Sequence, residues 1–345
     1  MMNVVQVGYG YWGANIARKL MDSSKFELKA LCEVSPERAE RAKKALPEKI
    51  TISNHYEDFL NTDDIDAFII ATQTELSFEI AMKAMANGKH IFIEKPIATT
   101  VERALKLRDM AYKMNVILHC DHIMLYNPYY RYIKQMIDNG ELGDLIYFDV
   151  SKLNLGPIRK DVNALMDLAV HDVAVIDYFM GGKEVRRLSA FGETPFGRQE
   201  TLTYLTLKYD NFIAHIKSSW VSPIKVRQTM IAGTKKMVIF DDMSYDKVKI
   251  YDCGIDVVQG KEYGQYEFLS RTGDIYIPNI PFEDSLQNSL EYFENCVQTG
   301  QQSLSGPEPS LRVMKILEWA QKELRTIPNV NSDYGFDYVA ASKDC

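Results

Sequence analysis

The sequence predicts an α/β protein of two parts, a doubly wound parallel sheet followed by an α/β unit with a large, open, mostly antiparallel sheet. Apolar strand-like runs alternate with amphipathic helical segments over the first third of the chain, as in parallel sheets. After about residue 122, many strand-like runs follow one another with few helices between them. The length of 345 residues also favours two domains. We expect boundaries at 1–122 and 123–330, with a polar tail at 331–345.

The first part reads as a regular series. Ser35 and Pro36 form a favourable cap and first-turn pair for the helix after the second strand. The strand at 65–72 lacks alternation, as expected where both faces are buried. The expected strands are 3–8, 26–34, 65–72, 90–94 and 116–121, with helices at 12–21, from 36, at 75–88 and at 100–114.

The second part begins with a helix at 127–140, which carries apolar residues on one face. A further, mostly apolar helix is expected at 163–180, and two more at 285–297 and 310–324. Turns rich in Gly, Asp-Asn and Lys-Lys favour antiparallel or mixed pairing of the strands. These strands are expected at 145–155, 184–192, 201–209, 212–221, 225–233, 236–241 and 247–252.

The composition limits the partners and the compartment. The net charge is −7 and there is no run of basic residues, so nucleic acid or an acidic membrane is not expected as the main partner. Five scattered cysteines without CxxC pairs argue against a disulfide framework and a cysteine zinc site. A strand pattern from the first residues leaves no room for a signal peptide, and no apolar run approaches ~18 residues. We expect a cytoplasmic protein.

A glycine motif follows the first strand and opens the first helix. Gly8, Gly10 and Gly13 have GxGxxG spacing, with Tyr11 and Trp12 inside the motif. The first glycine permits a tight turn, the second lets backbone approach a pyrophosphate, and the third lets helix and strand pack closely. The helix N-terminus then faces the phosphates. This context predicts a Rossmann domain that binds a dinucleotide.

Residues after the next strands refine the cofactor. Glu33 ends the second strand, where an acid accepts hydrogen bonds from the ribose hydroxyls and repels a 2′-phosphate. NAD is therefore expected rather than NADP, although Arg38 nearby weakens that preference. Thr72 and Gln73 follow the buried third strand, at a place that commonly lines the dinucleotide.

The tripeptide Glu94-Lys95-Pro96 follows the strand at 90–94. Open α/β sheets bind ligands at the carboxyl ends of their strands, so Lys95 is expected beside the glycine loop. Pro96 stiffens the turn, and Glu94 is placed to orient the lysine and to contact the cofactor. A partly buried lysine near a positive nicotinamide shifts readily toward neutrality.

Asp167 and His171 are four residues apart in the expected helix at 163–180, with Asn163 one turn earlier. A solvated helix face is one explanation. The helix is otherwise apolar, which favours a substrate-binding role for all three. His119 and His122 point to opposite faces if they continue a strand, so we expect structural roles for them and no metal site.

Hydride transfer is the chemistry that suits these residues. Oxidation of a secondary alcohol needs a base for the hydroxyl proton, and the pKa of histidine suits that transfer at neutral pH. Lys95 would stabilise the developing alkoxide, while Asp167 would hold a neighbouring hydroxyl. His171 is the expected proton acceptor.

With these motifs the sequence resembles the Gfo/Idh/MocA oxidoreductase family over nearly its whole length. The likeness includes VGYGYWG, GKHIFIEKPIA, DLAVHDVAVIDYFMGG and EDSLQNSLEYFENCVQTG. The resemblance implies a Rossmann domain, a second domain whose open sheet often forms the oligomer contact, and a homodimer or homotetramer. It also implies the roles given above for Lys95, Asp167 and His171.

Within the family, the sequence looks like the branch that oxidises nucleotide sugars at C3. Arg159 and Lys160, just before the helix with His171, are suited to a phosphate or uronate carboxylate. Many relatives carry a histidine where this chain has Ser77, so a contact near the cofactor differs. Three alternatives stay open: a dehydrogenase of a free polyol or sugar phosphate, an NAD-dependent glycosidase, and a non-catalytic NAD-binding sensor.

Overall fold

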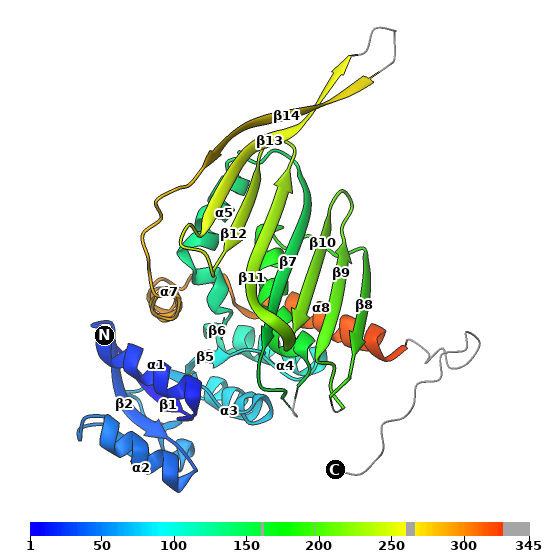
Figure 1. The fold of residues 1–345 in the computed structure, drawn as a ribbon. Coiled ribbons are helices and arrows are strands. Elements are labelled where there is room, and N and C mark those ends of the chain that lie inside the picture. The colour runs from blue at the N-terminus through cyan, green and yellow to red at the C-terminus, as the bar shows by residue number, and fades with distance from the viewer. Residues whose placement is uncertain (160–161, 197, 260–265, 327–345) are drawn as a thin grey trace, which may run out of the picture.

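The computed structural model describes residues 1–159, 162–196, 198–259 and 266–326 (Figure 1). Lys160 and the expected tail at 331–345 lie outside the described residues. Two sheets organise the described chain, a six-stranded one near the N-terminus and an eight-stranded one after it. None of the described helices is long and apolar enough to cross a bilayer.

The first sheet is parallel throughout, in the order β3-β2-β1-β4-β5-β6. Successive strands are therefore added on one side of β1 up to β3 and on its other side from β4 onward. Doubly wound sheets bind ligands at this point between β1 and β4, where the strand order reverses. Every residue of β4 is buried, in agreement with its unbroken apolar sequence. The elements are β1 Met2–Val7, α1 Tyr11–Asp22, β2 Phe26–Cys32, α2 Pro36–Ala45, β3 Thr51–Ser53, η1 Tyr56–Phe59, β4 Ala67–Ile70, α3 Thr74–Ala86, β5 His90–Glu94, α4 Val101–Met114 and β6 Leu118–Asp121.

Side-chain caps fix where several helices begin. The Ser35 hydroxyl accepts a hydrogen bond from the Arg38 amide and starts α2, as the sequence predicted. Thr100 caps α4 in the same way, and the Asn127 side chain accepts from two amides at the start of α5. Each cap satisfies amides that have no partner inside the helix.

The second sheet is mixed and mostly antiparallel, with β7 and β10 as its parallel neighbours. Its order is β14-β13-β12-β11-β7-β10-β9-β8. β14 was not expected from the sequence, and β13 is longer than expected because the two strands pair as a hairpin that projects from the sheet (Figure 1). The strands are β7 Leu145–Leu155, β8 Arg187–Glu193, β9 Leu202–Lys208, β10 Ile213–Ser219, β11 Val221–Gly233, β12 Met237–Asp241, β13 Val248–Gln259 and β14 Tyr266–Tyr276.

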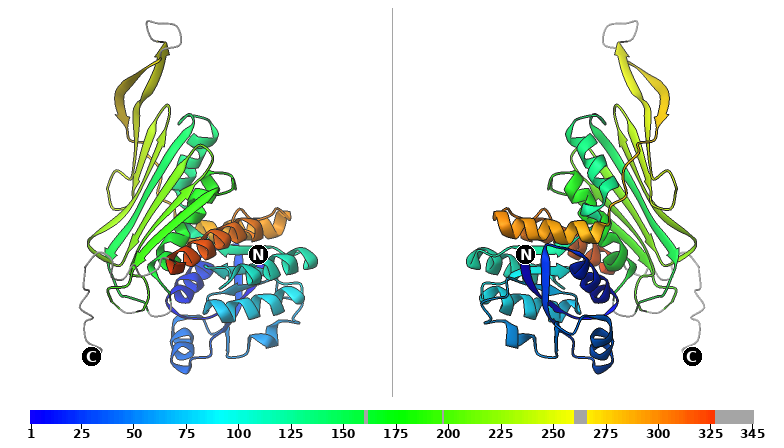
Figure 2. Two further views of the ribbon diagram at one scale, coloured as in Figure 1. Left: turned by 90° about the vertical axis from the view of Figure 1, so that its right-hand side faces the viewer. Right: turned by 90° about the vertical axis from the view of Figure 1, so that its left-hand side faces the viewer.

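Described helices cover one face of this second sheet, and no described helix lies on its other face, here called the bare face (Figure 2). Phe148, Ile231 and Phe240 point to the covered face, where they are buried. The helical elements are η2 Ile123–Tyr126, α5 Pro128–Asp138, the π-helical turn η3 Leu165–Ala169, α6 Val170–Phe179, α7 Ser285–Thr299 and α8 Pro307–Thr326.

The last two helices connect the two sheets. Leu290 and Phe293 of α7 join Phe92 and Ile16 of the first sheet and α1 in one buried cluster. α8 packs against α4 of the first unit as well as against α6 and β8 of the second. This packing holds the carboxyl edge of the first sheet against α6.

Candidate active site

The glycine loop leaves an open cradle at the start of α1. Gly8 has φ +98°, and a Cβ there would lie 2.4 Å from the Ala71 carbonyl oxygen. A Cβ on Gly13 would lie 2.3 Å from the Gly8 carbonyl oxygen, so helix and strand pack as closely as predicted. Gly10 would place a Cβ in open space. α1 begins at Tyr11 without an acidic residue in its first turn, so these residues fit a dinucleotide pyrophosphate.

Glu33 is fixed beside this loop. Its carboxylate oxygens accept hydrogen bonds from the Tyr9 amide at 2.8 Å and the Ser35 amide at 2.9 Å. The side chain is buried, and its remaining acceptor capacity suits ribose hydroxyls. The geometry therefore fits the adenosine half of a dinucleotide.

Arg41, which the sequence reasoning missed, contacts the same loop. Its guanidinium donates to the Tyr9 carbonyl oxygen at 2.7 Å and lies 5.3 Å from the Tyr9 ring centroid. Arg38, the residue predicted from the sequence, and Arg41 are both exposed, so the role of Arg38 stays a prediction. Arg41 lies about one helical turn further along α2, a spacing that signals a shared helix face.

Thr72 and Gln73 follow β4 on the other side of the glycine loop. The Thr72 methyl group would lie 3.0 Å from a Cβ on Gly8, which places this residue against the loop. Its hydroxyl is 2.8 Å from the hydroxyl of Ser77, and Gln73 is the N-terminal cap residue of α3. Ser77, at the position where many relatives carry a histidine, is thus hydrogen-bonded to Thr72, a residue of the expected cofactor site.

Lys95 and Asp167 meet between the two parts of the chain. The lysine Nζ lies 3.7 Å from Asp167 Oδ1 and donates to the Asp167 carbonyl oxygen at 3.2 Å. Arg159 donates to the same Oδ1 at 3.0 Å, so the carboxylate lies between two cations. Burial lowers the pKa of Lys95, while the negative charges of Asp167 and Glu94 oppose that shift.

Glu94 and Asp121 are cross-strand neighbours at the ends of β5 and β6. Burial raises the pKa of both carboxyls, and the charge of Asp121 raises that of Glu94 further. Asp121 accepts from the Ser289 hydroxyl at 2.6 Å, whereas one buried oxygen of Glu94 has no hydrogen-bond partner among the described residues. Burial and the neighbouring charge thus both favour the protonated form of Glu94, the residue before Lys95.

His171 is the second residue of α6, the regular helix that follows the π turn. Burial lowers its pKa well below the ordinary value, and the charges of Lys95 and Lys152 lower it further. The ring is therefore neutral at pH 7 and able to accept a proton. Its buried Nδ1 has no hydrogen-bond partner in the part of the chain that the structure describes. Asp167 lies inside the π turn that directly precedes α6, so the segment that carries His171 also carries the partner of Lys95.

Asn163 is buried and its side chain is engaged elsewhere. Its amide nitrogen donates to Glu200 at 2.8 Å and to Gln321 at 2.9 Å, while its oxygen accepts from the Met166 amide. These bonds attach the start of the π turn to the segment before β9 and to α8. The Asn163 side chain thus caps the start of the helix, and the backbone carbonyl oxygen of Asn163 accepts from the Asp167 amide at 3.1 Å.

Sequence reasoning also missed an ion pair at Asp172, the residue that follows His171. Lys152 on β7 lies 2.9 Å from a carboxylate oxygen of Asp172, and both side chains are almost fully buried. Arg227 on β11 acts on the same carboxylate. Because Asp172 is the residue after His171, this contact fixes the start of α6 against the sheet.

His119 and His122 have different surroundings. His119 stacks between Phe92 and Tyr126 and has hydroxyl partners on both ring nitrogens, which confirms its structural role. His122 is equally buried, yet neither of its ring nitrogens has a hydrogen-bond partner among the described residues. A structural role for His122 therefore stays a prediction. The residue directly follows β6, at the edge of the sheet where ligands bind.

Two family models match this chain. Residues 2–122 match the oxidoreductase family with an NAD-binding Rossmann fold, and residues 130–239 match the GFO/IDH/MocA C-terminal domain. Together these segments cover most of the chain, including both sides of the site.

Individual relatives are distant. An uncharacterized oxidoreductase of Streptococcus pneumoniae is 25% identical over 59% of each chain. The scyllo-inositol 2-dehydrogenase (NAD(+)) of Bacillus subtilis is 26% identical over 85% of each chain. Among solved structures, UDP-N-acetylglucosamine 3-dehydrogenase from Acidithiobacillus ferrooxidans has a TM-score of 0.79 and 21% identity, covering 94% of this chain and 97% of its own.

Proposed function

Because this chain belongs to the Gfo/Idh/MocA family of NAD(P)-dependent oxidoreductases, we propose that it oxidises a secondary hydroxyl of a nucleotide sugar, at C3, to a keto sugar. The observation that carries this proposal is the contact of Lys95 with Asp167 at the carboxyl edge of the glycine-loop sheet. In this proposal, residues 1–122 bind the cofactor, and residues 123–330 bind the substrate and form the oligomer contacts.

His171 is the proposed acid/base. Its neutral ring takes the proton of the substrate hydroxyl, since burial holds its pKa low. Nicotinamide, when bound, supplies the acceptor for the hydride that leaves the same carbon. The protein therefore has to separate a proton from a hydride and keep water away from both.

Lys95 stabilises the oxygen as its proton leaves. Its ammonium group, held by Asp167, donates a hydrogen bond to the developing alkoxide. Asp167 has a second task, because its carboxylate also accepts from Arg159 and can accept from a neighbouring sugar hydroxyl. A side chain held on two sides loses little freedom when the substrate binds.

The substrate class rests on Arg159 and on two relatives. Arg159 is partly exposed beside Asp167, where a second anion such as a phosphate or carboxylate would meet its guanidinium. The fold-level likeness to UDP-N-acetylglucosamine 3-dehydrogenase supports a nucleotide sugar. The likeness to scyllo-inositol 2-dehydrogenase supports the second candidate, a free polyol.

NAD is the proposed cofactor because Glu33 is fixed by two backbone amides at the adenosine end of the cradle. A 2′-phosphate there would meet a buried carboxylate. Calorimetric titration should find NAD bound more tightly than NADP. Glu33→Ala should reduce the ratio of the NADP to the NAD dissociation constant by about tenfold, or about 1.4 kcal/mol. Equal affinities in the wild type would contradict the assignment.

The bare face of the second sheet is the proposed contact of a homodimer or homotetramer. It carries partly exposed apolar side chains, among them Tyr204 and Ile213. The four cysteines of the described residues are free and three of them are buried, which supports a reducing, cytoplasmic compartment. Light scattering on the purified protein tests the oligomer, and a monomer at all concentrations would refute it.

The decisive experiment measures NADH absorbance after mixing protein and NAD with UDP- and dTDP-hexoses, myo-inositol, scyllo-inositol and sugar phosphates. Among these substrates, only a nucleotide sugar should lead to NADH formation. Product analysis separates the alternatives: a glycosidase releases free sugar with only catalytic NAD, and a sensor binds NAD without turnover. Either result would overturn the proposed dehydrogenase.

A further inference from the structure

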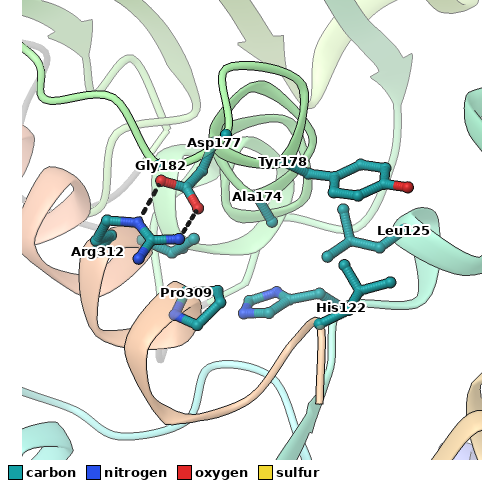
Figure 3. Close-up of a pocket in the computed structure, with 11 residues that line it drawn as sticks. His122, Leu125, Ala174, Asp177, Tyr178, Gly182, Pro309 and Arg312 are labelled. Atoms are coloured by element: carbon teal, nitrogen blue, oxygen red, sulfur yellow. Dashed lines mark hydrogen bonds and ion pairs between the residues drawn. The ribbon is translucent and has the colours of Figure 1, made fainter. Parts of the chain in front are cut away.

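A small cavity lies behind α6, on the side of the helix that faces α8 and η2. Its volume is about 100 Å³, several times the ~10–15 Å³ that one water molecule needs. Figure 3 shows the imidazole of His122 pointing toward Pro309 and Arg312, below the ion pair of Arg312 with Asp177. The lining includes Leu125 and Ala174.

His122 is the unusual member of this lining. The side chain is 2% exposed, and both ring nitrogens have no partner within the described protein. An imidazole buried in this way costs about 1–3 kcal/mol for each unsatisfied group unless water satisfies it. The cavity beside the ring is large enough for such water, and its lining includes two further polar side chains, Asp177 and Arg312.

The same histidine is next to the catalytic groups. Glu94 and Asp121 are matched cross-strand partners, so the residues that follow them, Lys95 and His122, leave adjacent strands at one edge. α6 makes the second connection. His171, Ala174 and Tyr178 have i, i+3, i+7 spacing on one helix face, and the last two line the cavity.

We propose that His122 and this cavity form the proton exit of the active site, carrying the substrate proton from His171 to solvent. The inference rests on the proposed function. Each oxidised hydroxyl gives one hydride to NAD and one proton to His171. The proton then passes through water to one ring nitrogen of His122, because no hydrogen bond joins the two rings in the described structure. The other nitrogen of His122 releases a proton to cavity water, which carries it to solvent past Arg312 and Asp177. No reactant beyond substrate and NAD is required.

The charges around His122 agree with a relay. The charge of Lys95 acts on its ring, and His122 in turn acts on His171 of α6. Asp177 of α6 and Arg312 of α8 line the same cavity. Asp121 directly precedes His122 and is the cross-strand partner of Glu94. Burial, aided by the charge of Lys95, lowers the pKa of His122 to about 4. The resting ring is therefore neutral, with one donor and one acceptor nitrogen, and it passes a proton without retaining it.

The test compares His122→Ala with Leu125→Ala, which enlarges the same cavity without removing a titratable group. NADH formation is followed in steady state and in a single turnover, using NAD with UDP-N-acetylglucosamine and with myo-inositol, at increasing concentrations of imidazole. We expect His122→Ala to slow steady-state turnover by about tenfold or more while the single turnover is nearly unchanged. Imidazole should restore the rate of His122→Ala and leave Leu125→Ala unaffected.

Wild-type activity with an unchanged His122→Ala rate would overturn the relay, as would a loss that imidazole fails to restore. Equal losses in the single turnover would also overturn it, because His122 would then act in the chemical step. If His122→Ala does not fold, His122→Asn is measured in the same way. A high-resolution crystal structure gives an independent readout, since a dry cavity contradicts the proposal. A wild type inactive with every sugar tested would refute the proposed function instead.

Discussion

Lys95 reaches across from the first sheet to a π-helical turn of the second part, where its Nζ lies 3.7 Å from Asp167 Oδ1 and 3.2 Å from the Asp167 carbonyl oxygen. Asp167 lies within the π turn Leu165–Ala169, and π turns are frequent at functional sites.

The first prediction concerns this contact. Lys95→Met should lower turnover by about 10²- to 10⁴-fold with little effect on NAD affinity, because the alkoxide loses its donor. Steady-state kinetics and calorimetric NAD titration measure the two effects. Lys106→Met, on the exposed surface of α4, serves as the control. Unchanged turnover of Lys95→Met would exclude Lys95 from the reaction.

Gly10→Ala should fold normally and lose NAD affinity. A Cβ on Gly10 meets nothing within 4 Å, so the protein itself accommodates it, yet it enters the space left for the pyrophosphate. Thermal unfolding and NAD titration check the two parts. Gly13→Ala is the contrasting variant, since its Cβ would lie 2.3 Å from the Gly8 carbonyl oxygen and should destabilise the fold. Normal NAD binding by Gly10→Ala would contradict the location of the cradle.

Lys152→Met should be strongly destabilising. Removal of the lysine leaves the Asp172 carboxylate buried and unpaired, which typically costs about 3–5 kcal/mol. The double variant Lys152→Met with Asp172→Leu should recover most of that loss, because no charge is then buried. Urea denaturation measures the free energies of unfolding. A double variant no more stable than Lys152→Met would show that the pair does more than neutralise charge.

Acid should destabilise the protein through His119. Burial lowers the pKa of His119 to about 3, below the ordinary value of 6.5, so the folded state resists a proton that the unfolded chain binds. The free energy of unfolding should therefore fall as pH decreases below 6.5, by about 1.4 kcal/mol per pH unit for this residue. In urea denaturation between pH 6.5 and pH 5, the free energy of unfolding of His119→Gln should fall less steeply than that of the wild type. His55 is exposed, so His55→Gln should follow the wild-type curve. Parallel curves for wild type and His119→Gln would contradict the prediction.

Much of the fold followed from local sequence. The unbroken apolar run of β4, the cap at Ser35 and the glycine motif each act within a few residues, so the first sheet was predictable. The hairpin of β13 and β14 was not expected in full, because its strands are exposed and lack the alternation of a strand packed on a core.

The sequence by itself determined the parallel sheet, the glycine cradle and the position of Lys95 at the carboxyl edge of β5, since strand direction and turn chemistry are local. Only the tertiary structure decided which polar side chains meet there. Asn163 turned to Glu200 and Gln321, while His122 was left without a hydrogen-bond partner beside a cavity. Side-chain direction in a helix or after a strand depends on the distant segments that pack against it. In this chain those segments include α8, which returns to the site from near the end of the sequence.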